Sequence, residues 1–68
     1  MAPAAITRLL ELTRDINHEV KIAAIYALGE GADPVPAAVT RLLELTRDIN
    51  NEVKVAAIRA TGRISRRG

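Results

Sequence analysis

The spacing of apolar residues in the first quarter of the chain predicts an amphipathic helix. Apolar positions recur three or four residues apart, and charged residues fall between them on the opposite face. The apolar and near-apolar positions are Ile6, Leu9, Leu10, Leu12, Thr13 and Ile16, interleaved with Arg8, Glu11 and Arg14. Pro3 precedes this pattern, in the first helical turn, where the missing backbone N–H costs nothing. The helix is therefore expected to begin at Pro3.

A second helix is expected directly after the first. Residues 15–17, Asp-Ile-Asn, should end the first helix and supply an N-cap side chain for the second. Glu19 would then lie in the first turn, near the positive end of the helix dipole. The side expected to be buried consists of Val20, Ala23, Ala24, Ala27 and Leu28. Gly29 is expected to stop this helix, and the two prolines of residues 31–36 keep the linker extended.

The same pattern then occurs a second time. Residues 3–29 align with residues 36–62 after a shift of 33 positions, and 22 of the 27 pairs are identical. The five differing pairs are Ile6/Val39, His18/Asn51, Ile22/Val55, Tyr26/Arg59 and Leu28/Thr61. Identity at positions that look exposed indicates a recent duplication or a designed, consensus-derived sequence. We predict one all-α domain over residues 1–68, an α-solenoid fragment of two helix-turn-helix repeats (3–35 and 36–68) with four helices.

The two second-helix segments carry a family resemblance. NHEVKIAAIYALG and NNEVKVAAIRATG resemble HEAT-like repeats of the phycobilisome-lyase type, whose pattern is a capping Asp or Asn, Glu-Val-Arg, an alanine pair and Ala-Leu-Gly. Lys21 and Lys54 replace the arginine of that pattern, and Thr61 replaces its leucine. The resemblance implies the HEAT-like fold. It transfers no activity, because lyase-type and DNA-repair relatives use many repeats and additional residues.

Composition excludes several functional classes. The chain has no cysteine, and His18 and Tyr26 are its only histidine and aromatic residue. It contains neither a catalytic Ser/His/Asp or Cys/His set nor a glycine-rich phosphate loop, so we expect no enzyme and no cofactor. A lone histidine makes neither a metal site nor a general base. No apolar run approaches the ~18 residues of a membrane span, so we expect a soluble protein, cytoplasmic if expressed in a cell.

Three of the five differences between the repeats fall on one stripe of the second helix. His18, Ile22 and Tyr26 are four residues apart, and the same stripe differs in the second repeat. The resemblance places this stripe on the concave face used for partner contact, and tyrosine and arginine are enriched at contact hot spots. The predicted protein-interface residues are His18, Ile22, Tyr26, Asn51, Val55, Arg59, Arg63 and Arg66. The alternative is that Ile22/Val55 is a neutral core exchange and His18/Asn51 a solvated pair.

The two repeats also differ in charge. Residues 1–33 carry three basic and five acidic side chains, whereas residues 34–68 carry seven basic and three acidic. The reversal is concentrated at the equivalent pairs Glu30/Arg63 and Asp33/Arg66. The arginines at positions 59, 63, 66 and 67 could neutralise a few phosphates. Because the net charge is only +2, we expect no specific recognition of nucleic acid.

Self-association is the function that the repeats favour. A two-repeat solenoid exposes an apolar flank at each end, and the candidates for flank or core contacts are Ile6, Leu10, Ile16 and Leu28 on one side and Val39, Leu43, Ile49 and Ile58 on the other. Because the repeats are alike, the second flank of one chain should fit the first flank of another, and the opposite charges favour this register. We predict a head-to-tail homo-oligomer, a closed ring or else a filament.

Two alternatives to self-association through the flanks stay open. The concave stripe could bind another protein. Alternatively, Arg59, Thr61 and Arg63 could act as a C-terminal cap, which would leave a monomer or a face-to-face dimer.

Overall fold

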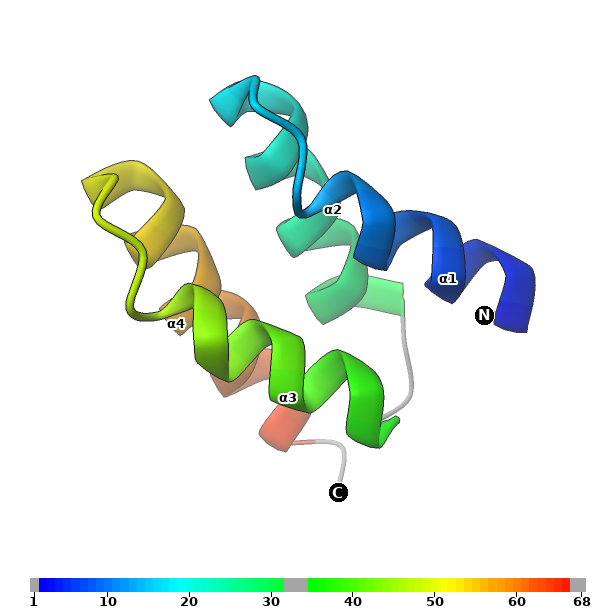
Figure 1. The fold of residues 1–68 in the computed structure, drawn as a ribbon. Coiled ribbons are helices and arrows are strands. Elements are labelled where there is room, and N and C mark those ends of the chain that lie inside the picture. The colour runs from blue at the N-terminus through cyan, green and yellow to red at the C-terminus, as the bar shows by residue number, and fades with distance from the viewer. Residues whose placement is uncertain (1, 32–34, 67–68) are drawn as a thin grey trace.

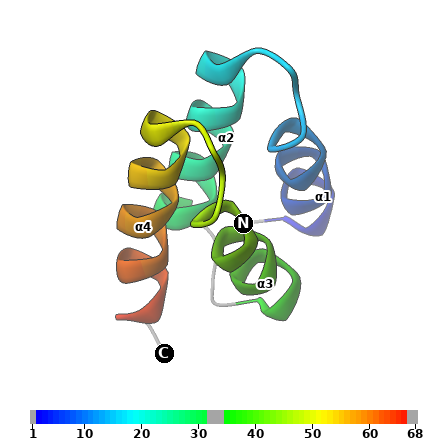
Figure 2. The ribbon, with the colours of Figure 1, turned by 60° about the vertical axis from the view of Figure 1, so that its left-hand side comes forward.

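The computed structural model describes residues 2–31 and 35–66, which form four helices in two consecutive pairs (Figure 1). The helices are α1 (Pro3–Leu12), α2 (His18–Gly31), α3 (Pro36–Leu45) and α4 (Asn51–Ser65). Helices α2 and α4 lie side by side in one layer, and α1 and α3 lie in the other (Figure 2). The predicted all-α fragment of two helix-turn-helix repeats is confirmed.

The start of the first helix in each repeat follows the sequence prediction. Pro3 and Pro36 are each in the first turn of a helix, and the residue before each proline, Ala2 or Val35, has an extended backbone. A proline there has the correct φ angle and lacks only an N–H that would have had no helical acceptor. Pro34, the other proline of the predicted linker, lies outside the described residues.

The turn between the two helices of a repeat is held by side chains that replace the missing helical hydrogen bonds. Asp15 Oδ1 accepts the backbone N–H of Asn17 at 2.8 Å, and Asn17 Oδ1 accepts the backbone N–H of Val20 at 3.1 Å. The second repeat does the same through Asp48 and Asn50, at 2.8 and 3.0 Å. The predicted N-caps are therefore confirmed, and the two turns are built alike.

For Ile16 and Ile49 a core contact is excluded, so that half of the prediction is wrong, whereas a flank contact stays a prediction. Both were candidates for flank or core contacts, but their residues are 97% and 100% exposed. The helical phase that would bring Ile16 onto the apolar face ends at Leu12, because the Asp-Ile-Asn turn begins soon afterwards. The isoleucine therefore points to solvent in both repeats.

Gly29 was predicted to stop the second helix, and this is also wrong. Helix α2 continues to Gly31, and its counterpart α4 runs past Gly62 to Ser65. Gly29 is buried, and a Cβ atom there would lie 2.8 Å from Ala60 Cβ and 2.9 Å from Ala60 Cα. No glycine among the described residues has a positive φ. Glycine is needed at position 29 because α2 and α4 approach each other closely there.

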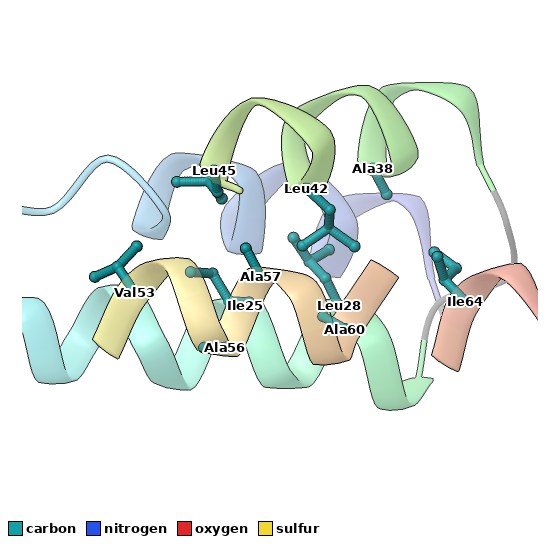
Figure 3. Packing of buried hydrophobic residues seen from close by; sticks show 10 residues of the cluster. All are labelled: Ile25, Leu28, Ala38, Leu42, Leu45, Val53, Ala56, Ala57, Ala60 and Ile64. Atoms are coloured by element: carbon teal, nitrogen blue, oxygen red, sulfur yellow. The ribbon is translucent and has the colours of Figure 1, made fainter. Parts of the chain in front are cut away.

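The hydrophobic core lies at the junction between the two repeats (Figure 3). Its buried members come from α2, α3 and α4, and α1 contributes only partly buried residues. The core consists of Ile25, Leu28, Ala38, Leu42, Leu45, Val53, Ala56, Ala57, Ala60 and Ile64. Each repeat therefore depends on its neighbour to bury apolar surface, as in other repeat proteins.

The predicted buried side of the second helix was correct only in part. Ala24 and Leu28 are buried, and they are joined by Ile25, which the prediction omitted. Val20 and Ala23 are exposed instead. They lie on the side of α2 that faces away from the second repeat, so no neighbouring helix covers them.

Candidate functional site

Polar contacts across the junction between the repeats fix how one repeat is placed on the other. Lys21 Nζ lies 3.5 Å from Asp48 Oδ2, and both side chains are less than one-fifth exposed. Asp48 also accepts the backbone N–H of Asn50. This backbone hydrogen bond is the main cause that lowers the pKa of Asp48 below its usual value. Burial is the next largest influence and opposes it, and the charge of Lys21 lowers the pKa further.

Asp48 is therefore expected to make folding sensitive to acid. Its pKa is lower in the folded state than in the unfolded state, so its contribution to stability is complete above about pH 5 and is lost as the pH falls through the lowered pKa. Asp48→Asn should lower stability at neutral pH and reduce this acid dependence, as measured by urea unfolding at a series of pH values. Asp15→Asn is the matched control, because within the chain it alters the same turn in repeat one without breaking an ion pair of the junction. Both substitutions are measured in the Ala27→Arg background, which prevents Asp15 from contacting a second copy. An equal effect of both substitutions would show that the junction contact of Asp48 with Lys21 adds nothing to the acid dependence beyond the turn hydrogen bond.

Arg41 makes a second junction contact, at the end of α1. Its Nε donates to Thr13 Oγ1 at 2.9 Å and its Nη2 donates to the Thr13 carbonyl at 3.2 Å. Thr13 is the C-cap residue of α1 and is buried. A guanidinium there satisfies a carbonyl that the helix leaves without a partner. Arg41 also pairs with Glu44 at 3.3 Å, and Arg8 pairs with Glu11 in the same way.

A third junction contact joins two residues at equivalent positions of the repeats. Arg63 Nη1 donates to Glu30 Oε1, and both side chains remain slightly more than half exposed. The reversed charges at these positions are visible in the sequence, but their contact is visible only in the structure. The contacts of Lys21 with Asp48 and of Arg41 with Thr13 were not predicted either. The same lysine and aspartate occur at equivalent positions of both repeats, and this was a signal that they could pair between neighbouring repeats.

The predicted interface residues divide between two separate hollows. Ile22, Tyr26, Asn51 and Val55 line a hollow of about 250 Å³ between α2 and α4, together with Glu52. The stripes of the two repeats therefore come together, as expected for one surface. His18 is not among the residues that line this hollow. Its Nδ1 is 3.0 Å from Asn50 Nδ2.

The three arginines of the predicted interface line a different hollow. Arg59, Arg63 and Arg66 surround a space of about 500 Å³ on α4, with Ile58 and Gly62 as its apolar part. Arg59 therefore does not extend the hollow that contains Tyr26. Asp33 and Arg67, which entered the charge comparison, lie outside the described residues.

The described residues provide no group of three or more His, Cys, Asp or Glu side chains that could hold a metal ion. None of the helices in this part of the chain is long and apolar enough to cross a membrane. What the residues do provide is a helix pair that occurs twice, with side-chain contacts that join the two copies. The family model of HEAT repeats matches residues 3–67.

The chain belongs to the HEAT-repeat family. HEAT repeats are generally scaffold or protein-interaction modules. The match covers both helix pairs, so the family accounts for the layered fold and for the α2–α4 contact. No curated protein matches the chain, and no solved structure matches it.

Equivalent residues of the two HEAT repeats differ in exposure, and these differences identify the flank of the second repeat. Ile25 is fully buried, whereas Ile58 is 55% exposed. A Cβ at Gly29 would collide with Ala60, whereas a Cβ at Gly62 would meet nothing within 4 Å. We define the second-repeat flank as the residues that are identical in the two repeats but more exposed in repeat two: Leu43, Thr46, Ile58 and Gly62.

The opposite comparison identifies the flank of the first HEAT repeat. Val20 is 37% exposed, whereas its counterpart Val53 is fully buried. The first-repeat flank consists of Ala5, Leu9, Leu12, Val20, Ala23 and Ala27, whose counterparts Ala38, Leu42, Leu45, Val53, Ala56 and Ala60 are all buried. The second-repeat flank thus corresponds to the surface that repeat one buries in the junction, and the first-repeat flank corresponds to the surface that repeat two buries there. Among the described residues, no further repeat covers either flank.

The remaining flank candidates from the sequence fall elsewhere. Leu28 is in the core, and Ile6, Leu10 and Val39 are partly buried against it. Leu43 and Ile58 are exposed and lie on the second-repeat flank, whereas the sequence had left open whether they belong to a flank or to the core.

Proposed function

We propose that this HEAT-repeat chain is a non-catalytic scaffold that assembles with copies of itself, head to tail. In this arrangement the second-repeat flank of one copy packs on the first-repeat flank of the next. The contact would repeat the junction that already joins the two repeats within one chain. The assembly closes into a ring if the rotation from one copy to the next divides a full turn, and otherwise grows as a filament.

The observation that carries this proposal is the open space over Gly62. Within the chain, Gly29 accepts the close approach of Ala60. Gly62 is the counterpart of Gly29, and Ala27 is the counterpart of Ala60. Ala27 of the next copy would therefore fit over Gly62 as Ala60 fits over Gly29, and it would cover the exposed side of Ile58.

The polar residues of the two flanks support the same register. Lys54 is the counterpart of Lys21 and Asp15 that of Asp48, so Lys54 of one copy and Asp15 of the next would reproduce the ion pair seen within the chain. In the same way, Thr46 and Arg8 would reproduce the contact between Thr13 and Arg41. Complementary charges across an interface fix its register and suppress other arrangements.

Head-to-tail assembly is tested by blocking one flank at a time. Gly62→Arg blocks the second-repeat flank and Ala27→Arg blocks the first, and both positions lie outside the buried core. The unaltered chain should have a solution mass that is a multiple of the chain mass, and each variant alone should be a monomer. An equimolar mixture of the two variants should form a 1:1 dimer, because one intact flank of each kind remains. Size-exclusion chromatography with light scattering measures all four samples.

Two outcomes would contradict the proposal. The first is an unaltered chain that stays monomeric at every concentration tested, and the second is a Gly62→Arg variant that forms dimers by itself. Circular dichroism of both variants, compared with the unaltered chain, establishes that each is folded. Tyr26→Glu is the control for position, because Tyr26 lies in the α2–α4 hollow and not on a flank. It should leave the assembly mass unchanged.

The α2–α4 hollow supports a second candidate function, the binding of another protein. Ile22, Tyr26 and Val55 give this hollow an apolar lining, and aromatic residues in such places are frequent contact hot spots. If Tyr26→Glu lowered the assembly mass while helicity was kept, the hollow and not the flanks would be the interface.

The likeness to phycobilisome-lyase-type repeats and the designed or consensus origin stay predictions from the sequence.

A further inference from the structure

The charges at positions 30 and 63 bear on which partner the second-repeat flank accepts. We infer that the opposite charges of Glu30 and Arg63, at equivalent positions of the two repeats, make the second-repeat flank select the first repeat of another copy of this chain. Arg63 would then pair both with Glu30 of its own chain and with Glu30 of the next copy. The inference rests on the head-to-tail assembly proposed above and adds the determinant of partner choice. Its basis is that this position of the repeat contacts itself in the neighbouring repeat.

Self-contact distinguishes this position from the other junction contacts. Lys21 pairs with Asp48, which occupies a different position of the repeat, so identical repeats can make that contact any number of times. Glu30 and Arg63 occupy the same position, 33 residues apart, and they form an ion pair with each other. With the same charged residue in every repeat, like charges would meet at each junction. The contact is attractive only if the sign alternates from one repeat to the next.

The same rule fixes the charge of the residue that a further repeat would place next to Arg63. A repeat that packs on the second-repeat flank places its own counterpart of Arg63 next to Arg63, and that residue must be acidic. The first repeat of a further copy provides Glu30 there. Another copy of the second repeat would instead bring an arginine against Arg63. The residue pattern therefore favours a partner that presents repeat one.

The spacing along the helices agrees with this placement. Ala60 and Arg63 are three residues apart on α4, and they contact the adjacent residues Gly29 and Glu30 of α2. Ala27 and Glu30 have the same spacing on α2. If Ala27 of the next copy lies over Gly62, its Glu30 lies beside Arg63 without any change of register.

The surroundings of Arg63 suit a second carboxylate. A guanidinium has five N–H donors, and the Arg63 side chain is 55% exposed although it pairs with Glu30. Arg59 and Arg66 line the same hollow, with Ile58 and Gly62 as its apolar part. An acidic helix end with small apolar residues, as at the first-repeat flank, matches this combination of positive charge and apolar surface.

The test compares matched and mismatched charges in a complex that has only one interface. The Ala27→Arg chain presents only its second-repeat flank and the Gly62→Arg chain only its first. Each is made in two forms, one with the natural charges and one with Glu30→Arg and Arg63→Glu together. The double reversal keeps the ion pair within each chain, so folding is preserved and only the pairing between chains changes.

Dissociation constants of the four combinations, measured by isothermal titration calorimetry at low salt, should fall into two groups. The two matched combinations should bind about tenfold more tightly than the two mismatched ones, because like charges then meet across the interface. The difference should shrink at high salt, since these side chains are exposed to solvent. Equal affinity in all four combinations would overturn the charge rule and leave head-to-tail assembly intact. No binding in any combination would overturn the proposed assembly, and the charge rule with it.

Discussion

Ile25→Ala is expected to lower the free energy of unfolding by about 3 kcal/mol, the usual range for an Ile→Ala change in a packed core being about 2–5 kcal/mol. Ile25 has no exposed surface and packs in the core at the junction between the repeats. A core in a chain this small supplies only about 3–5 kcal/mol in total. The substitution should therefore leave a large fraction of the chain unfolded at room temperature, as measured by urea denaturation followed by circular dichroism.

The second repeat provides a matched control for Ile25→Ala. Ile58 is the same residue at the equivalent position, but it is 55% exposed. Ile58→Ala should cost less than about 1 kcal/mol, because little buried surface is lost and no cavity forms. Both changes are made in the Ala27→Arg background, so that association does not add to the measured stability. Similar losses for the two substitutions would mean that the core is not concentrated at the junction.

Gly29→Ala is expected to destabilise the chain by about 1–2 kcal/mol, although alanine is the better helix former. The added Cβ would lie 2.8 Å from Ala60 Cβ and 2.9 Å from Ala60 Cα. Since one of these atoms belongs to the backbone, α2 and α4 must move apart, and overpacking of this kind costs about 1–3 kcal/mol. Because both distances are below 3.0 Å, we expect a cost in the upper part of this range, which exceeds the helix-propensity gain of at most about 1 kcal/mol. Urea denaturation in the Ala27→Arg background measures the net effect.

Gly62→Ala is the matched control, and the sign of its effect should be opposite. A Cβ at Gly62 meets nothing within 4 Å, so only the helix propensity changes, and the monomer should gain about 0.5 kcal/mol. In the chain with both flanks intact, the same substitution should weaken association, because it fills the space proposed for Ala27 of the next copy. If Gly29→Ala stabilised the chain as much as Gly62→Ala, the close approach of α2 to Ala60 would be disproved.

Much of the local structure follows from the sequence because its causes are local. Prolines at the first helical turn place the starts of α1 and α3. The Asp-x-Asn turns cap the following helices through hydrogen bonds that span only two or three residues. The repeat itself predicts that both helix pairs fold alike, and the resemblance of the second helices to HEAT-like repeats agrees with the family match.

Apart from Ile16 and Ile49, whose exposure follows from the local turn, predictions failed where the deciding contact lies far away in the sequence. Glycine at position 29 is typical of a helix end. Only the position of Ala60, 31 residues later, shows that α2 and α4 approach each other closely at Gly29. For the candidate site, the sequence identified all the residues that line the α2–α4 hollow except Glu52, and the three arginines on α4 or directly after it. It did not separate them into two hollows, because that depends on how α4 lies against α2.

The sequence by itself determined the helices, their caps and the repeat, but it could not determine which copy of each repeated residue is buried. Ile25 and Ile58 lie at equivalent positions and differ completely in exposure. The same holds for Val20 and Val53. The spacing of apolar residues along a helix predicts which face of the helix each residue occupies. Burial depends on whether a neighbouring repeat covers that face. Only the tertiary structure supplies that neighbour, and it thereby separates the core from the two flanks on which the proposed assembly depends.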